Sequence, residues 1–563
     1  MEADSQSGRR SKELRADQAD PLFEIRALHY HYGDGAPALK GIDLEIFPGD
    51  KVALVGQNGA GKTTLIKHLN GLYRPTEGQV LYLGRELEGD HLARARLEIG
   101  ILFQDPDDQL FCNTLDEDVG FGPRNQRLAR DEVEARVHGA LSRVGLDHLR
   151  YKAPHHLSYG QKKRAALATL LSMTPKVLVL DEPSANLDPK QEQFFIEMLR
   201  GFPGTLVCIS HDLPLLYEFC DRAVVLEDGR IHHDTTMQDL VSHRDYLRDH
   251  GLDFTFRLSC CQDYGNGHGH HEGHDHDHAH EPHPHAGTAV TPVSPLPAGR
   301  LDADTVIWID DYAYRYADGT WGIRDVRLAI AEGDSIAIVG QNGAGKSTLV
   351  SCIAGIFEGR GTYLFDGKLI TGKARKGLWR EIGITFQDPA DQVFSPSCRE
   401  EVAFGPRQQG LSPSEIQARV EESLARVRLS GFEDRVPHHL SAGERKRVAL
   451  ASVLAMRPRV IILDEPTANL DPQSELLLCE ILQELDVTKI LISHDIDIIA
   501  LLCDRSVVMH QGRIIRDYPT TEFMRDEHLV SINGLDYTFK NACCREIQRL
   551  QRQASATLPL FHP

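Results

Sequence analysis

Short runs of apolar residues recur along this 563-residue chain and predict its main strands and helices. KVALV at 51–55 and SIAIV at 335–339 predict strands, and a helix-like run, TLIKHL or TLVSCI, follows each one after a glycine-rich loop. VLVLDE at 177–182 and VIILDE at 460–465 stay apolar until they end in two carboxylates. A continuous apolar run of this kind is typical of a central strand that is buried on both faces of a parallel sheet. The pattern therefore predicts an α/β fold with a mainly parallel sheet.

The pattern occurs twice, because the second half of the chain repeats the first. GQNGAGKTT at 56–64 returns as GQNGAGKST at 340–348, and FQDPDDQLF at 103–111 returns as FQDPADQVF at 386–394. Later repeated pairs are HHLSYGQKKRAALA and HHLSAGERKRVALA, VLVLDEPSANLDP and VIILDEPTANLDP, ISHD in both halves, and GLDFTFRLSCC and GLDYTFKNACC. The offset between the copies is 284 residues for the first motif and 283 for the others. The chain is therefore interpreted as a tandem duplication of one domain.

The duplication also sets the predicted domain boundaries, since a chain of this length exceeds what a single hydrophobic core supports. We expect a disordered tail at 1–20, a first domain at 21–245, a short appendage with a linker at 246–303, a second domain at 304–528 and a C-terminal appendage at 529–563.

Composition narrows the class of protein. A net charge of −20 argues against a protein whose main task is to bind the nucleic acid backbone. No apolar run approaches the ~20 residues that a membrane-spanning helix needs. The N-terminus lacks the hydrophobic stretch of a secretory signal, and the eleven cysteines do not form a disulfide framework. A cytoplasmic protein is the simplest interpretation.

The two glycine-rich loops match the phosphate-binding pattern G-x4-G-K-[ST] between a strand and a helix. Glycines let backbone N–H groups surround phosphate oxygens, and the N-terminus of the following helix adds a favourable potential. Lys62 and Lys346 are placed to neutralise phosphate charge, while the hydroxyls of Thr63 and Ser347 can ligate Mg²⁺. The loops therefore predict two nucleotide sites.

The carboxylates at the ends of the buried strands complete this chemistry. Ligands bind at the carboxyl edge of a parallel sheet, which is where these strands end. Asp181 and Asp464 are placed to hold Mg²⁺, and Glu182 and Glu465 can act as general bases on the attacking water.

Together with the stretches LSYGQ and LSAGE, these motifs make each copy resemble the nucleotide-binding domain of an ATP-binding cassette (ABC) protein. The resemblance implies two tandem phosphate-loop domains, each with a mainly parallel sheet core and a helical subdomain. It also implies ATP and Mg²⁺ as cofactors, and ATP hydrolysis as the activity. The two domains would pack head to tail, so that each ATP would lie between the phosphate loop of one copy and the LSYGQ or LSAGE signature of the other.

The resemblance transfers functional residues position by position. In the first copy the nucleotide-binding residues would be Tyr32, Gly56, Asn58, Gly59, Gly61, Lys62, Thr63, Thr64, Gln104, Ser158, Gly160 and Asp181. In the second copy they would be Tyr316, Gly340, Asn342, Gly343, Gly345, Lys346, Ser347, Thr348, Gln387, Ser441, Gly443 and Asp464. The Mg²⁺ ligands would be Thr63, Gln104, Asp181, Ser347, Gln387 and Asp464. The catalytic residues would be the bases Glu182 and Glu465 with the switch histidines His211 and His494, and Asp188 and Asp471 would close the D-loops.

The stretch after each Q-loop glutamine indicates which kind of ABC protein this is. QDPDDQLF and QDPADQVF, followed by DVGFGP and EVAFGP, resemble the ATPase pair of energy-coupling factor (ECF) transporters. In that group a transmembrane subunit docks beside the Q-loop, a separate membrane protein binds the substrate, and a small C-terminal region helps hold the two ATPases together. The resemblance places the chain at the cytoplasmic face of the membrane. Asp107, Asp108 and Asp391 would carry negative charge at the docking surface, or they form only a solvated turn.

A translation factor of the ABC-F group is the alternative, since those proteins also carry two cassettes in one chain and act on the ribosome. Their cassettes are joined by a long charged helix. The linker here is acidic and rich in histidine, glycine and proline, which does not favour a helix or RNA binding.

Histidines gather in that linker, where GHGHHEGHDHDHAHEPHPH spans residues 267–285. Two roles stay open: a flexible tether with incidental metal affinity, or a sensor or buffer for transition metals. The second role favours nickel or cobalt over vitamins as the transported substrate. The candidate metal ligands are His268, His270, His271, His274, His276, His278, His280, His283 and His285. The paired cysteines Cys260, Cys261, Cys543 and Cys544 are either ordinary thiols or a second metal or redox cluster.

Overall fold

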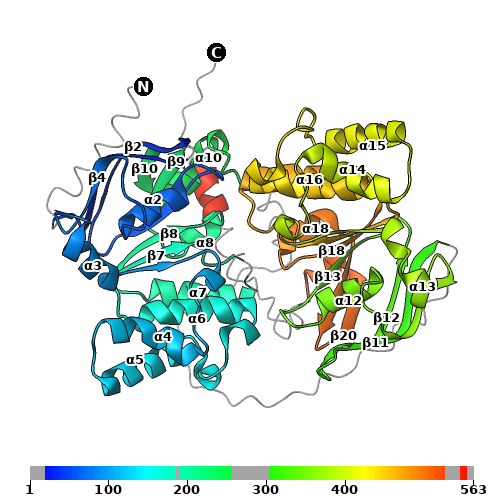
Figure 1. Ribbon diagram of the computed structural model, residues 1–563, viewed down its shortest axis with the longest axis horizontal. Helices are drawn as coiled ribbons and strands as arrows, with labels where there is room; N and C mark the ends of the chain where they lie inside the picture. Colours follow the sequence, from blue (N-terminus) through cyan, green and yellow to red (C-terminus); the bar gives the residue numbers. More distant parts are fainter. Residues whose placement is uncertain are drawn as a thin grey trace.

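The computed structural model describes residues 20–254, 304–526 and 546–553, apart from Asp34, Asn186 and Asp188. It contains two domains of the same architecture (Figure 1), called cassette 1 (20–254) and cassette 2 (304–526) below. The predicted α/β fold is confirmed in both.

Each cassette contains ten strands. In cassette 1 these are β1 (Phe23–His31), β2 (Pro37–Ile46), β3 (Lys51–Val55), β4 (Glu77–Tyr82), β5 (Arg85–Glu86), β6 (Ile99–Leu102), β7 (Val177–Asp181), β8 (Thr205–Ile209), β9 (Arg222–Glu227) and β10 (Arg230–Thr236). In cassette 2 they are β11 (Thr305–Arg315), β12 (Trp321–Ala331), β13 (Ser335–Val339), β14 (Arg360–Phe365), β15 (Lys368–Leu369), β16 (Ile382–Thr385), β17 (Val460–Asp464), β18 (Thr488–Ile492), β19 (Arg505–His510) and β20 (Arg513–Pro519).

The helices follow the same repeat. Cassette 1 contains α2 (Lys62–Leu69), α3 (Gly89–Glu98), α4 (Leu115–Asn125), α5 (Arg130–Arg143), α6 (Tyr159–Leu171), α7 (Pro189–Arg200), α8 (Leu213–Tyr217), α9 (Met237–Ser242) and α10 (Arg244–Asp249), with 3₁₀ turns η1 (Pro106–Asp108), η2 (Asp147–Leu149) and η3 (Pro154–His156). Cassette 2 contains α12 (Lys346–Ile353), α13 (Gly372–Arg375), α14 (Cys398–Gln408), α15 (Pro413–Arg426), α16 (Ala442–Leu454), α17 (Pro472–Gln483), α18 (Ile496–Leu502) and α19 (Thr520–Phe523), with 3₁₀ turns η5 (Leu378–Arg380), η6 (Pro389–Asp391) and η7 (Pro437–His439).

Two sheets form the body of each cassette. In cassette 1 the larger sheet has the order β10-β9-β3-β8-β7-β6, in which only the β9–β10 pair is antiparallel. The smaller sheet, β2-β1-β4-β5, is antiparallel. Cassette 2 repeats both orders. Because β3 lies between β9 and β8, the loop that follows it leaves from the middle of the carboxyl edge, beside the ends of β8 and β7.

A helical subdomain completes each cassette. In cassette 1 it consists of α4 and α5, which contact each other, and α6, which also packs against β6 of the large sheet. The apolar side chains of α6 join those of β7 and α7 in one buried cluster, so the subdomain and the sheet share a core. α14, α15 and α16 repeat this arrangement.

The two cassettes lie side by side in opposite directions (Figure 1). In this view the helical subdomain of cassette 1, with α4, α5 and α6, lies at the bottom, and that of cassette 2, with α14, α15 and α16, lies at the top. A hydrogen bond joins the phosphate loop of cassette 1 to cassette 2: Asn58 Nδ2 donates to Asp471 Oδ2 at 3.1 Å. The arrangement is therefore head to tail.

A short helix near the end of the chain packs on the opposite cassette. Residues 546–553 are helical and follow cassette 2 in the sequence. Ile547 and Leu550 are nevertheless buried in the core of cassette 1, together with Met237 and Leu247. Gln551 Nε2 donates to the backbone oxygen of Val241 at 3.0 Å.

Within the described parts of the chain, no helix is both long and apolar enough to cross a bilayer.

Candidate functional site

One cavity of about 1290 Å³ collects most of the predicted site residues. Both phosphate loops line it, so the cavity runs between the cassettes. From cassette 1 it is lined by Tyr32, Asn58, Gly59, Gly61, Lys62, Thr63, Thr64, Gln104, Asp181, Glu182 and His211. From cassette 2 it is lined by Tyr316, Asn342, Gly343, Gly345, Lys346, Ser347, Thr348, Gln387, Asp464, Glu465 and His494. Residues that the sequence places in two copies of one motif therefore meet around a shared space.

The phosphate loops adopt the same closed conformation in both copies. Gly61 and Gly345 precede the helices with φ of 100° and 101°, a backbone conformation that glycine tolerates. Lys62 Nζ donates to the backbone oxygens of Gly56 at 2.7 Å and Gln57 at 2.8 Å. Lys346 makes the equivalent contacts in cassette 2. The loop carbonyls thus hold each ammonium group over the loop, and burial lowers the pKa of Lys62.

A hydroxyl and a carboxylate lie together beside the first loop. Thr63 Oγ1 donates to Asp181 Oδ1 at 3.4 Å. Burial raises the pKa of Asp181, and burial together with the charge of Glu465 raises that of Asp464 to about 6. Hydroxyl and carboxylate oxygens are the ligands that Mg²⁺ prefers, and a bound cation would favour the ionised carboxylates. The donor set therefore fits Mg²⁺.

Each glutamate after the buried strand pairs with the histidine after the next strand. His211 Nε2 lies 3.3 Å from Glu182 Oε1, and His494 Nδ1 lies 2.8 Å from Glu465 Oε1. Burial raises the pKa of Glu182 to about 7, and it lowers the pKa of His211 to about 3. Glu182 Oε1 and His211 Nδ1 are buried without a hydrogen-bond partner. A carboxylate in this state can accept a proton from a third group, and a neutral imidazole can donate its single N–H to an acceptor.

Two lysines that sequence reasoning missed hold these glutamates in place. Glu182 and Glu465 have φ of 47° and 45°, a left-handed conformation that costs a non-glycine residue about 1–3 kcal/mol. Lys163 Nζ on α6 donates to the backbone oxygen of Glu182 at 2.7 Å, and Lys446 on α16 donates to that of Glu465 at 3.1 Å. Burial lowers the pKa of each of these lysines to about 8. The signal in the sequence was a lysine at the same position of both signature repeats, QKKR and ERKR.

The paired tyrosines lie at the rim of the cavity. Tyr32 and Tyr316 are 42% and 38% exposed and line the cavity, so part of each side chain is open to a ligand. Their hydroxyls bond Thr64 Oγ1 at 2.6 Å and Thr348 Oγ1 at 2.8 Å, which fixes each ring against the phosphate-loop helix. Trp321, which sequence reasoning missed, lines the same rim in cassette 2, where cassette 1 has Pro37. The two copies differ at this position, so the repeat gave no indication that Trp321 belongs to the site.

The signature serines begin α6 and α16. Ser158 and Ser441 are N-caps with complete capping boxes, closed by Gln161 and Glu444. Ser158, Gly160, Ser441 and Gly443 do not line the cavity, nor do Gly56 and Gly340, although the intervening Tyr159 and Ala442 do. Tyr159 also donates to the backbone oxygen of Gln104 at 3.2 Å, which links the signature helix to the Q-loop.

Several predicted residues lie outside the described parts of the chain. They are Asp188, the linker histidines between 268 and 285, and Cys260, Cys261, Cys543 and Cys544.

Comparison with known proteins agrees with this geometry. The ABC transporter family matches residues 39–185 and 323–468. A Methanosarcina acetivorans protein named "Putative ABC transporter ATP-binding protein" is 34% identical over 535 residues, covering 90% of this chain and 87% of that protein. One of the same description from Caldanaerobacter subterraneus subsp. tengcongensis is 31% identical over 544 residues, covering 92% of this chain and 94% of that protein.

Among solved structures, that of cbiO1 from Clostridium perfringens, described as part of the ABC transporter complex cbiONQ, is also similar. It is 37% identical and covers 44% of this chain and 100% of that chain, with a TM-score of 0.38. From the family match and the full-length relatives, the chain belongs to the ABC transporter family, as an ATP-binding protein that carries two cassettes and hydrolyses ATP.

Proposed function

We propose that this chain supplies both ATPases of an ECF-type importer, which drives uptake through separate membrane subunits. The observation that carries the proposal is a surface that both cassettes repeat beside the Q-loop. It consists of an exposed pair of phenylalanines, Phe111 with Phe121 in cassette 1 and Phe394 with Phe404 in cassette 2. We call these the Phe pairs. The full-length relatives named as transporter ATP-binding proteins agree with a transport role.

The Phe pairs are large apolar groups held open to solvent. Phe111 and Phe394 are 67% and 64% exposed, and each stacks edge to face on its partner at 5.1 and 5.2 Å. An exposed apolar group of fixed geometry that recurs in both copies is typical of a protein-binding surface. Aromatic side chains also provide much of the binding energy at such surfaces. The Phe pairs therefore suit the docking of an apolar helix.

Buried carboxylates hold the first phenylalanine of each pair. Asp118 Oδ1 accepts from the backbone N–H groups of Phe111 at 3.1 Å and Cys112 at 3.0 Å. Glu401 Oε2 accepts from Phe394 and Ser395 at 3.0 and 2.8 Å. Each loop is thus anchored to the helix that carries the second phenylalanine, so the surface does not depend on a flexible segment.

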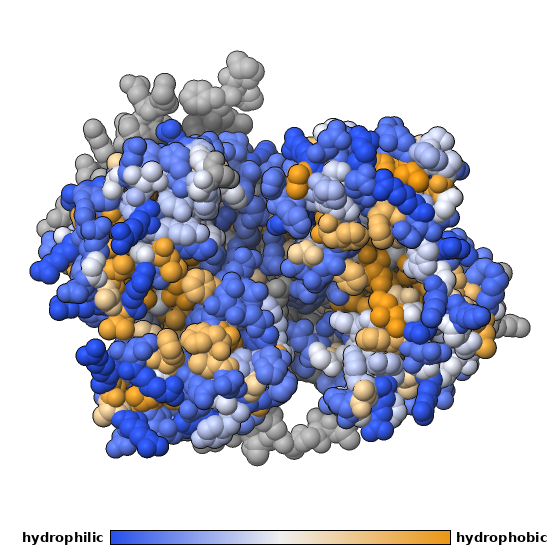
Figure 2. Space-filling view, viewed as in Figure 1, coloured by the Kyte–Doolittle hydropathy of each residue, from blue (hydrophilic) through white to orange (hydrophobic). Residues whose placement is uncertain are grey.

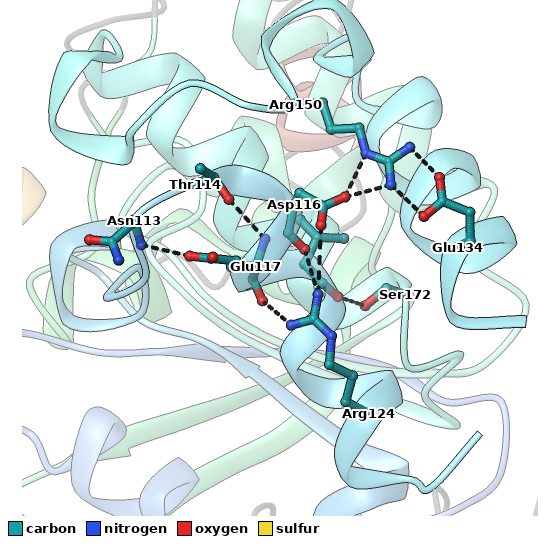
Figure 3. A network of polar contacts seen from close by, with 9 residues as sticks. Asn113, Thr114, Asp116, Glu117, Arg124, Glu134, Arg150 and Ser172 are labelled. Atoms are coloured by element: carbon teal, nitrogen blue, oxygen red, sulfur yellow. Dashed lines mark hydrogen bonds and ion pairs between the residues drawn. The ribbon is translucent and has the colours of Figure 1, made fainter. Parts of the chain in front are cut away.

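A polar network fixes that helix within cassette 1 (Figure 3). Thr114 caps α4, and Arg150 reaches both Asp116 Oδ1, at 2.6 Å, and Glu134 Oε2, at 2.7 Å. Arg124 donates to the backbone oxygen of Glu117 at 3.2 Å. The network joins the start of α4 to α5 and to the segment before α6. A displacement of α4 can therefore be transmitted to α6, and the signature begins at the N-terminus of α6.

The acidic residues beside the Phe pairs divide into two groups. Both oxygens of Asp107 accept from Lys162 Nζ, at 2.7 and 2.8 Å, so its charge is largely offset within the cassette. Asp108 and Asp391 are exposed. We propose that these two provide the negative charge that meets basic side chains of the membrane subunit.

The cavity geometry supports the following roles for the site residues at ATP. Lys62 and Lys346 would neutralise phosphate charge, and Tyr32 and Tyr316 would stack on the base. Thr63, Ser347, Asp181 and Asp464, with Gln104 and Gln387, would hold Mg²⁺, which offsets charge on the phosphates when bound. Glu182 and Glu465 would take the proton of the attacking water, while His211 and His494 would donate to the terminal phosphate.

The most specific part of the proposal concerns the transported substrate. We propose a transition metal, nickel or cobalt, ahead of a vitamin, because the linker concentrates nine histidines within nineteen residues. The substrate itself would bind in the membrane subunits, and neither cassette would contact it.

Co-purification with candidate transmembrane subunits tests the docking surface. Replacing Phe111 and Phe394 with Ala should abolish co-purification, while ATP hydrolysis by the isolated chain stays within about twofold of the native rate. The matched control is Tyr151→Ala, because Tyr151 is 75% exposed on the same subdomain and lies outside the Phe pairs. The Tyr151→Ala variant should still co-purify with the membrane subunits.

Two outcomes would refute the proposal. One is full assembly of the Phe111→Ala/Phe394→Ala variant with the membrane subunits. The other is co-sedimentation of the native chain with ribosomes and with no membrane partner, which would establish the translation-factor alternative.

A further inference from the structure

Glu227, His232 and His250 converge on cassette 1, outside the ATP cavity. Glu227 ends β9, His232 lies in β10 and His250 follows α10. One carboxylate oxygen and one ring nitrogen from each histidine all lie within 4.8 Å of one another. None of the three residues lines the ATP cavity. We propose that this cluster is a binding site for a divalent transition-metal ion, and that its occupancy is coupled to ATP binding at the neighbouring phosphate loop.

The donor atoms already lie close to the separations that one ion requires. His250 Nδ1 is 2.7 Å from Glu227 Oε2, and His232 Nδ1 is 3.7 Å from the same oxygen. Two imidazole nitrogens with one carboxylate oxygen suit Ni²⁺, Co²⁺ or Zn²⁺, whereas Mg²⁺ and Ca²⁺ prefer oxygen ligands alone. His232 and Glu227 are 41% and 39% exposed, so an ion can enter from solvent.

A fourth residue, His233, is placed to orient the buried histidine. His233 Nε2 lies 3.0 Å from His250 Nε2, on the side of the ring away from Glu227. With a metal on Nδ1, His250 would donate its Nε2–H to His233, the kind of outer contact that fixes the tautomer of a ligating histidine. The ring of His233 is in turn stacked on Tyr246, at 5.1 Å. The site is therefore largely organised without an ion.

The duplication supplies an internal comparison, because cassette 2 has the same hairpin but keeps a metal-ligating residue at only one of the three donor positions. β9–β10 and β19–β20 pair antiparallel and share an irregularity at the same place. At the offset of 283, Glu227 corresponds to His510, which keeps a ligand type, whereas His232 corresponds to Ile515, His233 to Arg516 and His250 to Asn533. Asn533 lies outside the described residues. Since this hairpin folds with isoleucine and arginine at two of these positions, His232 and His233 are not required for the fold of the hairpin.

The cluster lies next to the nucleotide machinery. The backbone oxygen of His250 accepts from Gln57 Nε2 at 3.3 Å, and the backbone oxygen of Gln57 accepts from Lys62 Nζ. The next residue, Gly251, has φ of 64°, and a Cβ there would lie 2.3 Å from Gln57 Nε2 and 2.8 Å from Gln473 Oε1 of cassette 2. A metal that fixes His250 would thus order a contact of the phosphate loop, and the chain would lose less freedom when ATP binds. The metal should therefore lower the KM for ATP, and ATP should tighten metal binding in turn.

Calorimetric titration with Ni²⁺, Co²⁺ and Zn²⁺ tests the site. The full-length chain is used with the nine histidines of 267–285 replaced by serine, because those imidazoles also bind metals. This chain should bind one equivalent, with a d–d absorption band for Co²⁺. The double variant His232→Ile/His250→Asn, which copies cassette 2, should lose that equivalent and the band. His233→Ala should weaken binding by about 10- to 100-fold, as expected for an outer contact.

The matched control removes an exposed histidine that pairs with a single carboxylate. His138 Nδ1 lies 2.8 Å from Asp147 Oδ1, and this pair belongs to no group of three metal-ligating side chains within the described parts of the chain. His138→Ala should keep both the equivalent and the band. The site would be overturned if the control and the double variant bind metal equally. Thermal unfolding in the absence of metal must first show that both variants are folded.

The coupling has its own measurement on the same proteins. Added Ni²⁺ or Co²⁺ should lower the KM for ATP of the chain that retains the cluster and leave the KM of the His232→Ile/His250→Asn variant unchanged. An equal shift in both proteins, or none in either, would overturn the coupling.

Discussion

Glu182 and Glu465 combine features that surface glutamates lack. Both are mostly buried, both face a histidine, and both have a left-handed backbone that a lysine of the signature helix holds from behind. Strain of this kind persists only where the surroundings determine it, and it is typical of functional positions. The proposed bases are therefore positioned by their backbone as much as by their side-chain contacts.

The raised pKa of Glu182 predicts a pH dependence that one variant isolates. Glu465→Gln leaves only Glu182 as a base, and burial raises the pKa of Glu182 to about 7. Because a base must first lose its own proton, turnover of this variant should rise with pH through about 7. At pH about 6 it should be roughly one tenth of its plateau. Steady-state turnover at ATP concentrations well below the KM, which gives kcat/KM and so reports the pKa of the free chain, measures this, and a flat profile from about pH 6 to 8 would contradict it.

Removing both bases is the companion measurement. Turnover of the Glu182→Gln/Glu465→Gln variant should fall to background while ATP binding persists, since the amide keeps the shape of the side chain but cannot accept a proton. Turnover near the native rate would refute the assignment of both residues.

Lys163 provides a prediction about position. Lys163→Met keeps most of the buried volume but removes the donor to the backbone oxygen of Glu182. Misplacing the base should lower kcat by up to about 100-fold, with little change in the KM for ATP, because Lys163 does not line the cavity. Lys162→Met is the control, since its side chain pairs with Asp107 at the surface. A loss confined to the KM would contradict a positioning role.

For single residues, the sequence predicted the motifs that occur in both copies and missed contacts between residues that are distant in the sequence. The phosphate loops and the strand-end carboxylates are local patterns with a known chemistry, so the repeat was enough to indicate them. Lys163 acts on a residue nineteen positions away, and His250 meets Glu227 and His232 from another element. Pairings of this kind depend on tertiary structure, so the repeated lysine of QKKR and ERKR marks a position without indicating its partner.

Among the elements, α4 and α14 matter most for the proposed docking, and their sequence signals were mixed. The apolar strands 51–55 and 335–339 appear as β3 and β13 with the predicted bounds, because a buried strand must be apolar throughout. The QDP stretches instead form 3₁₀ turns, η1 and η6, each capped by the aspartate of Asp-Pro. Charge alone could not show that Asp107 pairs with Lys162 while Asp108 stays exposed.

The anchor between α4 and its loop makes a prediction about the element. Asp118→Ala leaves the backbone N–H groups of Phe111 and Cys112 without their charged acceptor. The free energy of unfolding should fall by about 1–3 kcal/mol, and binding to the membrane subunit should weaken because Phe111 is no longer held. Denaturant unfolding with a pull-down measures both. Glu401→Ala is the matched change in cassette 2, and unchanged stability in both variants would refute the anchoring role.

For the whole molecule, the duplication predicted two domains of one fold, and the structure confirms two α/β cassettes. Which surfaces face each other follows from contacts between distant residues, such as Asn58 with Asp471. The ECF resemblance implied that a C-terminal region helps hold the two ATPases together, but the repeated segments GLDFTF and GLDYTF did not indicate that residues 546–553 pack on cassette 1. That contact joins parts of the chain that do not repeat each other.

This helix yields the last prediction, which concerns how the cassettes stay together. Ile547 is fully buried and Leu550 nearly so, both in the core of cassette 1. A segment that follows cassette 2 but binds cassette 1 raises the effective concentration of one cassette at the other. Replacing both residues with Ala should remove about 2–5 kcal/mol of packing for each and detach the helix. Since ATP must then bring the cassettes together without this helix, the KM for ATP should rise while kcat at saturation changes little.

Arg549→Ala is the control, because Arg549 lies on the same helix and is 60% exposed. A KM for ATP equal to that of the Arg549→Ala control would mean that the helix does not hold the two cassettes together.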